Sequence, residues 1–159
     1  MSVTITIETP LQDDVRRLVD ALNAHLIPLS PLEFQFKMSV EQMAGSDTTL
    51  FVARDETGRA VGMGALKVHD AALGEVKRMF TDPAVRGQRV GSQLLEAIVG
   101  LAREKGLSTL MLETGTGEGM AEAHRLYIRR GFQTRGPFLD YPDSQWSAFF
   151  EMPLVAVPA

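Results

Sequence analysis

The stretch Val85-Arg86-Gly87-Gln88-Arg89-Val90-Gly91-Ser92-Gln93-Leu94-Leu95 determines how the rest of the chain is interpreted. It stands between an extended run at residues 75–81 and an amphipathic run at residues 90–105, so a strand must turn into a helix here. Glycine lets a backbone come close to a ligand, and the first N–H groups of a helix have no internal acceptor. The stretch therefore predicts an anion site, most often used for phosphate, although an ordinary strand-to-helix turn would also explain it.

Hydrophobic periodicity around this stretch predicts a chain in which strands and helices are mixed. Thr9 and Gln12 are spaced as a capping box for the first helix, with Pro10 at its first position. No repeat, low-complexity segment or interdomain linker interrupts the pattern, so residues 1–159 are expected to form a single α+β (mixed α/β) domain. Strands are expected at residues 3–7, 49–54, 60–68, 75–81, 109–114, 132–135 and 147–154, and helices at residues 11–25, 39–44, 90–105 and 120–130.

The composition excludes several classes of function. The 159 residues are 45% hydrophobic and 23% charged, and the formal net charge of -4 gives no broad basic field for nucleic acid. There is no cysteine, which removes disulfides and thiolate nucleophiles and fits a reducing compartment. The first residues do not resemble a signal peptide, and no apolar run is long enough to span a bilayer. We therefore expect a cytoplasmic protein with no nucleic-acid or membrane partner.

Other cofactor motifs are absent from the sequence. The glycines of residues 115–119 lie between an expected strand and an expected helix, but the third is misplaced for a dinucleotide fingerprint. There is no Walker-type phosphate loop. His25, His69 and His124 are scattered without the spacing of metal ligands, so no metal site is expected.

Two motifs together resemble one protein family. Residues 75–95 resemble the acetyl-coenzyme A motif of the GNAT superfamily of N-acetyltransferases, whose core Arg/Gln-x-x-Gly-x-Gly/Ala corresponds to residues 86–91. Residues 123–132 resemble the second landmark, Ala-x-x-Leu-Tyr-x-x-x-Gly-Phe. The C-terminal region is also similar to a subgroup called indole-acetic-acid acetyltransferase-like. The resemblance implies a central, mostly antiparallel, twisted sheet of about seven strands flanked by about four helices.

The same resemblance implies acetyl-coenzyme A (acetyl-CoA) as the acetyl donor, without a metal. The pantetheine arm would lie along Met79, Phe80 and Thr81 as an added strand does, with the N–H of Met79 as an oxyanion donor. Arg89 stands where the motif usually has glycine, and Met120 stands where an asparagine commonly holds the pantetheine arm. The pyrophosphate would lie on the loop formed by Arg86, Gly87, Gln88, Arg89, Val90, Gly91 and Ser92.

Two residues match the catalytic positions of the family. Glu75 matches the general base that takes a proton from the acceptor amine, although it could instead begin a strand and pair with a nearby cation. Tyr127 matches the general acid that protonates the departing thiolate, although it could instead be a core aromatic residue.

The resemblance implies acetyl transfer to a primary amine of a small molecule or peptide by direct attack. A non-catalytic acyl-CoA sensor or interaction module is the alternative, since Arg89 and Met120 depart from the pattern. Three acidic residues could favour a cationic acceptor and four aromatic residues could form apolar walls, but both groups could equally belong to loop packing or to a homodimer surface. These are Glu33, Asp140 and Asp143, and Phe34, Phe36, Tyr141 and Trp146.

Overall fold

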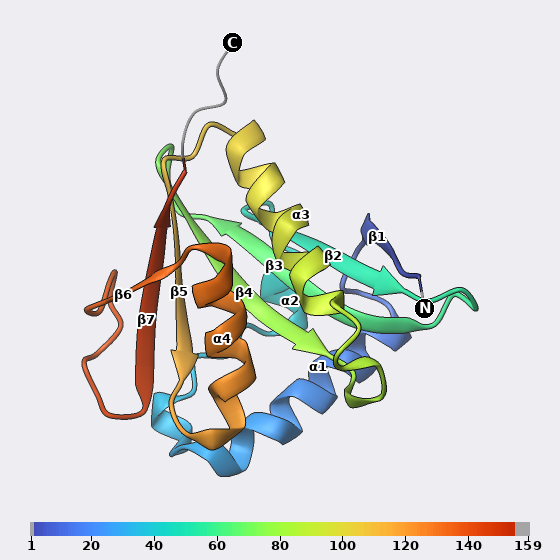
Figure 1. Cartoon of the computed structure of the whole chain (residues 1–159), viewed down its shortest axis with the longest axis horizontal. Coiled ribbons are helices and arrows are strands. Elements are labelled where there is room, and N and C mark those ends of the chain that lie inside the picture. The colour runs from blue at the N-terminus through green and yellow to red at the C-terminus, as the bar shows by residue number, and fades with distance from the viewer. Residues whose placement is uncertain (1, 155–159) are drawn as a thin grey trace.

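The computed structural model describes residues 2–154, apart from the side chain of Glu118. Its centre is one twisted seven-stranded sheet, as the family resemblance implies, and the strand order is β1-β2-β3-β4-β5-β7-β6 (Figure 1). Neighbouring strands are antiparallel except β4 and β5, which are parallel. The strands are β1 (Thr4–Ile7), β2 (Thr48–Arg54), β3 (Ala60–Val68), β4 (Leu73–Thr81), β5 (Thr109–Gly115), β6 (Gln133–Arg135) and β7 (Ser147–Pro153).

Helices cover both faces of the sheet, with α1 and α2 on one face and α3 and α4 on the other (Figure 1). Single 3-10 turns lie at Ile27–Leu29, Leu32–Phe34, Pro83–Val85 and Glu118–Met120. None of the helices between residues 2 and 154 combines the length and the apolar character needed to cross a bilayer. The four α-helices are α1 (Asp13–Leu26), α2 (Val40–Met43), α3 (Val90–Glu104) and α4 (Ala121–Arg130).

Two separate hydrophobic cores follow from this layering. Val15, Leu18 and Leu22 on α1 pack with Val52 and Met63 on one face of the sheet. On the other face, the apolar stripe of α3 lies close to β3, because a methyl group at Gly62 would come within 3.1 Å of the side chains of Val90 and Leu94. The start of α3 is thereby fixed against the sheet.

The parallel pairing of β4 with β5 is short. Leu73 pairs with Thr109, Gly74 with Leu110 and Glu75 with Met111, and the pairing ends there. Beyond this point the two strands diverge, as the ribbon shows (Figure 1). The carboxyl-terminal half of β4 therefore has β3 on one side and an open edge on the other, where an extended ligand can lie.

A β-bulge in β4 lies at the beginning of this open edge. Met63 pairs with Phe80 and Ala65 with Lys77, so Gly64 alone faces both Arg78 and Met79. Arg78 has a left-handed backbone, with φ of 55°, which costs a non-glycine residue about 1 kcal/mol. A side chain at Gly64 would come too close to the sulfur of Met79, so Met79 packs against this glycine in the bulge.

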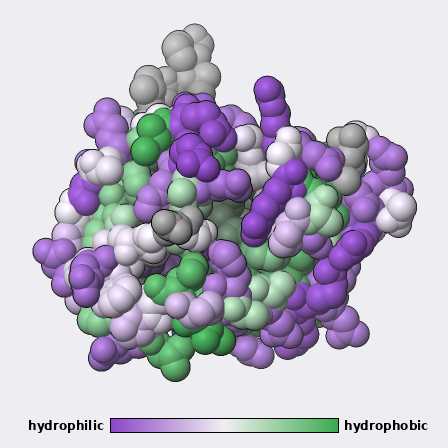
Figure 2. All heavy atoms as spheres, turned by 60° about the horizontal axis from the view of Figure 1, so that its bottom comes forward, coloured by the Kyte–Doolittle hydropathy of each residue, from purple (hydrophilic) through white to green (hydrophobic). Residues whose placement is uncertain are grey.

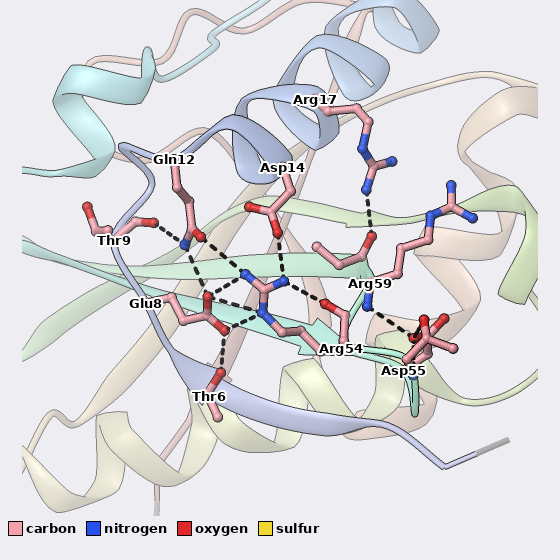
Figure 3. A network of polar contacts seen from close by, with 12 residues as sticks. Thr6, Glu8, Thr9, Gln12, Asp14, Arg17, Arg54, Asp55 and Arg59 are labelled. Atoms are coloured by element: carbon pink, nitrogen blue, oxygen red, sulfur yellow. Dashed lines mark hydrogen bonds and ion pairs between the residues drawn. The ribbon is translucent and has the colours of Figure 1, made fainter.

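The predicted capping box of the first helix is wrong. α1 begins at Asp13 with Gln12 as its N-cap, whereas Thr9 accepts a hydrogen bond from the N–H of Leu11. The reason is Arg54, at the end of β2, which attracts the polar side chains at the start of α1 (Figure 3). Its guanidinium binds both carboxylate oxygens of Glu8 at 2.7 and 2.9 Å, Asp14 at 2.6 Å and Gln12 at 3.2 Å.

Stability should depend on the Arg54 network in a pH-dependent way. The hydrogen bonds from Arg54 lower the pKa of Glu8 to about 2, below the ordinary value of 4.5. A carboxylate with a lowered folded-state pKa stabilises the fold above its unfolded pKa and loses that effect as the pH falls towards 2. We expect Arg54→Met to reduce the free energy of unfolding by about 1–2 kcal/mol at pH 7, after allowance for solvent screening.

Urea unfolding of both proteins between pH 7 and pH 2 checks this expectation, and the difference should shrink below pH 5 as Glu8 is protonated. Arg59→Met is the matched control, since the Arg59 side chain is 55% exposed and its ion pair with Asp82 is at the surface. It should change the stability by less than about 0.5 kcal/mol. A pH-independent difference for Arg54→Met would contradict the assignment.

Candidate active site

A pocket of about 810 Å³ opens where β4 and β5 diverge. It is lined by residues from α1, from the turns that follow α1, from β4 and β5, from the start of α3 and from most of the length of α4. Figure 2 brings forward the lower part of Figure 1, where the last turns of α1 and the first turn of α4 lie, and shows green hydrophobic surface among purple hydrophilic residues. The pocket therefore joins segments that are distant in the sequence.

The start of α3 forms one end of the pocket. Gly87 and Arg89 both have left-handed backbones, with φ of 84° and 63°, and they lead the chain from the Pro83–Val85 turn into Val90. The N–H of Gln93 bonds to the carbonyl of Arg89, so the N–H groups at residues 90–92 precede the first helical hydrogen bond. Such N–H groups, at the positive end of a helix dipole, suit a phosphate.

Most of the predicted donor-binding residues line this pocket. Gln88 is exposed and does not line the pocket. Arg89 takes the backbone conformation that glycine adopts most easily, which is why the usual glycine fits this position. Met120 packs near Gly115 and lines the pocket without capping α4 through its side chain. The lining residues among those predicted are Met79, Phe80, Thr81, Arg86, Gly87, Arg89, Val90, Gly91, Ser92 and Met120.

Tyr127 lines the middle of the pocket, although only 5% of the residue is exposed. Its ring packs edge-on against Phe132, at a centroid distance of 5.8 Å, as a core aromatic would. Burial, and secondly the charge of Glu113, raise the pKa of Tyr127 well above its ordinary value. The hydroxyl is therefore protonated at neutral pH and can act only as a proton donor there.

Glu113 is a carboxylate of the pocket that the sequence did not single out. It lies on β5 opposite Phe149 and accepts a 2.7 Å hydrogen bond from Ser147. Burial raises the pKa of Glu113, with the charge of Glu75 acting in the same direction and Ser147 and Lys77 opposing it. The sequence offered one signal, since Glu113 is an acidic residue in a strand of otherwise apolar alternation.

Glu75 lies outside the lining of the pocket, at the last paired position of β4. Its carboxylate is 2% exposed, accepts a 2.5 Å hydrogen bond from Tyr141, and lies 2.8 Å from Nε2 of His69. Lys77 donates to the Tyr141 hydroxyl at 2.8 Å and lies 3.5 Å from Glu75. Glu75 thus holds Lys77 and Tyr141 in place, and the structure does not bring it together with Tyr127 in the pocket.

The far end of the pocket, beneath α1, is the expected place for the acceptor. Phe34 and Phe36 line it, as expected for apolar walls, whereas Tyr141 and Trp146 do not. Gln35 fixes the segment by donating to the carbonyls of Leu26 and Ser30 at 2.9 and 2.8 Å. The three acidic residues that could have favoured a cationic acceptor, Glu33, Asp140 and Asp143, are exposed and lie outside the lining.

The charges around the pocket differ from those of the chain. Although the net charge of the protein is -4, lysine and arginine predominate among the described side chains of the lining. The acidic residues there are Glu113 and Glu122. A basic pocket on an acidic protein attracts anionic ligands and repels cationic ones. The basic lining residues are Lys37, Lys77, Arg78, Arg86, Arg89, Arg125 and Arg129.

Comparison with known proteins agrees with this geometry. Residues 46–134 match the family described as the acetyltransferase (GNAT) domain. The chain belongs to this family. This chain is 42% identical over 154 residues to the IAA acetyltransferase of Azospirillum brasilense, and the alignment covers 96% of this chain and 99% of that protein.

Solved structures of other acetyltransferases have the same fold. A proposed acyl-CoA N-acyltransferase from Klebsiella pneumoniae is 34% identical, with a TM-score of 0.79 over 96% of this chain and 98% of that one. A GNAT acetyltransferase from Elizabethkingia anophelis with acetyl-CoA bound is 19% identical, with a TM-score of 0.65 over 96% of this chain and 98% of that one. The recognition of an acetyltransferase from the two sequence motifs is confirmed, and the sensor alternative is not favoured.

The start of α3 can be tested at Gly91. A methyl group there would lie 3.3 Å from Cδ2 of Leu126 and 3.6 Å from Oγ1 of Thr81, so alanine fits with a small shift of a flexible side chain. Gly91→Glu places a carboxylate beside the N–H groups that would bind phosphate. We expect it to weaken acetyl-CoA binding at least about tenfold by charge repulsion and sterics, whereas Gly91→Ala should retain binding within a few-fold. Isothermal calorimetry measures both, and equal affinity of the two variants would place the phosphate site elsewhere.

Proposed function

We propose that this acetyltransferase transfers the acetyl group of acetyl-CoA directly to a primary amine of a small molecule or peptide. The observation that carries the proposal is the pocket itself. It runs from the N–H groups at the start of α3, past the bulge of β4, to Tyr127 and Glu113. The sequence contains no cysteine, so the chain supplies no thiolate for an acyl-enzyme route.

The donor fits the residues along this path. The N–H groups at residues 90–92 would bind the pyrophosphate, with Arg86 and Arg89 nearby as cations. The open edge of β4 at Met79 and Thr81 would take the pantetheine arm as an added strand. The N–H of Met79, in the bulge, would donate to the oxyanion that forms during attack.

The acceptor amine must lose a proton. A free alkyl ammonium has a pKa near ~10.4, so at neutral pH the amine arrives mostly protonated. Glu113 lines the pocket, and burial raises its pKa towards the range in which a carboxylate takes protons effectively. We propose Glu113 as the group that receives this proton, with Glu75 fixing Lys77 and Tyr141 beside it.

The leaving thiolate must gain a proton. Tyr127 lines the same pocket, and its hydroxyl is protonated at neutral pH, so it can supply this proton; burial raises its pKa and makes it a weaker acid than a free tyrosine. Tyr127 and Glu113 line the same pocket, and the charge of Glu113 is near enough to raise the Tyr127 pKa, which supports a proton donor and a proton acceptor at one site. This arrangement supports an enzyme and gives a non-catalytic sensor no advantage.

Tyr127→Phe tests the proton donor. The variant keeps the ring packing against Phe132 and removes the hydroxyl, so acetyl-CoA affinity should change little. General acid catalysis contributes roughly 10²–10⁴-fold, and kcat should fall by a factor in this range. Steady-state kinetics with an accepted amine, together with direct binding of acetyl-CoA, checks both parts. An unchanged kcat would return Tyr127 to a purely structural role.

Glu113→Gln and Glu75→Gln distinguish the two candidate bases. As a base, Glu113 must be ionised, so kcat in the wild type should rise as the pH rises through its pKa, which lies above the ordinary 4.5. We expect Glu113→Gln to lower kcat about 10²-fold or more and to remove this rise. The variant should remain folded, because neutralising a buried carboxyl with a raised pKa removes a cost above that pKa.

Glu75→Gln should lower kcat less than Glu113→Gln and should retain the pH dependence. Its neutral amide can still accept a hydrogen bond from Tyr141, but the ion pair with Lys77 is lost. If Glu75→Gln instead abolished the pH dependence and Glu113→Gln kept it, Glu75 would be the base and Glu113 a residue that shapes the pocket.

A further inference from the structure

Arg78 is a buried cation for which the fold provides no counter-ion. Only 8% of the residue is exposed, and its guanidinium forms no ion pair within residues 2–154. Nη2 donates to Oδ1 of Asn23 on α1, and Nε is buried without a hydrogen-bond partner in the same part of the chain. Arg54 provides the contrast, because its partly buried guanidinium forms ion pairs with two carboxylates, those of Glu8 and Asp14.

Burying an unpaired charge is unfavourable, and arginine cannot avoid the cost by losing its proton. Burial lowers the pKa of Arg78 to about 10, which still leaves it charged at neutral pH. Arg78 also has a left-handed backbone, because it lies in the β4 bulge. At the bulge, consecutive side chains no longer alternate regularly between the two faces of the sheet. A strained, desolvated cation persists where the surrounding structure requires it, and such positions cluster at ligand sites.

Arg78 lines the pocket at its acceptor end. It contacts α1 through Asn23, and its strand neighbour Lys77 lines the same end with a side chain that is 11% exposed. Lys77 differs from Arg78 in having a carboxylate, Glu75, at 3.5 Å. Lys37 also lines this end without an ion pair among the described residues but is only half-buried, so the buried positive charge that has no counter-ion here belongs to Arg78. Its bond to Asn23 places it on the face of the sheet that α1 covers.

We propose that the acceptor is a small amine that also carries an anionic group, a carboxylate or a phosphonate, and that Arg78 binds this group. The inference rests on the proposed acetyl transfer and names the class of its acceptor. Asn23 occupies one N–H of the Arg78 guanidinium, and the remaining terminal N–H groups of this cation can donate to an oxygen of such a group. Phe34 and Phe36 would contact the apolar body of the acceptor.

Matched acceptor pairs test the proposal. Phenylalanine and phenethylamine differ by one carboxylate, and 2-aminoethylphosphonate and ethylamine differ by one phosphonate. Acetylation is followed by release of free thiol from acetyl-CoA. We expect the wild type to prefer the anionic member of at least one pair by about 10- to 100-fold in kcat/KM, as charge-assisted hydrogen bonds typically provide. The pair that shows the preference identifies the anion.

Arg78→Met should abolish this preference while leaving acetyl-CoA affinity within about two-fold of the wild type. Because the change removes an unpaired buried charge, its melting temperature should equal or exceed that of the wild type. Arg78→Lys should retain part of the preference, since lysine supplies charge without the planar fork. Arg16→Met, on the exposed side of α1, is the control and should behave as wild type.

A second readout does not require turnover. Phenylacetate and methylphosphonate lack the amine, and at least one should raise the melting temperature of the wild type but not of Arg78→Met. The proposal is overturned if neither anion raises it and neither pair shows a preference. It is also overturned if Arg78→Met weakens acetyl-CoA binding, which would assign Arg78 to the donor, or if that variant loses stability strongly. Absence of acetyl-CoA binding in the wild type would instead reject the proposed function.

Discussion

The short parallel pairing between β4 and β5 is the constraint on which the rest of the site depends. Three residue pairs hold the two strands together, and beyond Glu75 and Met111 the pairing ends. Divergence exposes one edge of β4 inside the protein rather than at its surface, where an unpaired edge would invite aggregation. The helices on both faces then enclose the opened space as a pocket. The end of the pairing between β4 and β5 thus creates both the open strand edge that can bind a ligand and the enclosed space around it.

The buried ionisable groups of the pocket lower the stability of the fold. Glu113, Tyr127 and Arg78 are each desolvated, and burial shifts the pKa of each group towards its neutral form. By contrast, Arg54 and Glu8 stabilise each other far from the pocket. The buried groups of the pocket thus lower the stability of the fold, as expected when a site is organised for a ligand rather than for stability.

Much of the fold could be predicted from the sequence because its signals are local. The amphipathic stripe of α3 and the glycine that ends α4 are visible within a few residues, and both helices are confirmed. The capping of α1 failed because Arg54, distant in sequence, competes for Gln12. A capping box forms only if its side chains bond to the backbone at the helix start, and a competing partner from a distant part of the chain cannot be seen in the local sequence.

The site was less predictable for the same physical reason. The two motifs identified the loop at the start of α3 and the position of Tyr127, since those residues lie together in the sequence. Glu113 carries no motif, and its exposure to the pocket results from the distant divergence of β4. Arg78 could not be recognised either, because the bulge that turns it arises from the register between β4 and another strand, β3.

The presence of two cores has a consequence for the way such a protein can change. The donor end of the pocket is built on the core beneath α3, whereas the acceptor end is built on α1 and the turns that follow it. The segment of residues 27–37 is held largely by Gln35 and contributes no fully buried side chain. Substitutions in this segment can therefore reshape the acceptor end while the packing around the start of α3 stays intact. Diversification of acceptors within a constant donor chemistry requires such mechanical independence of the two halves.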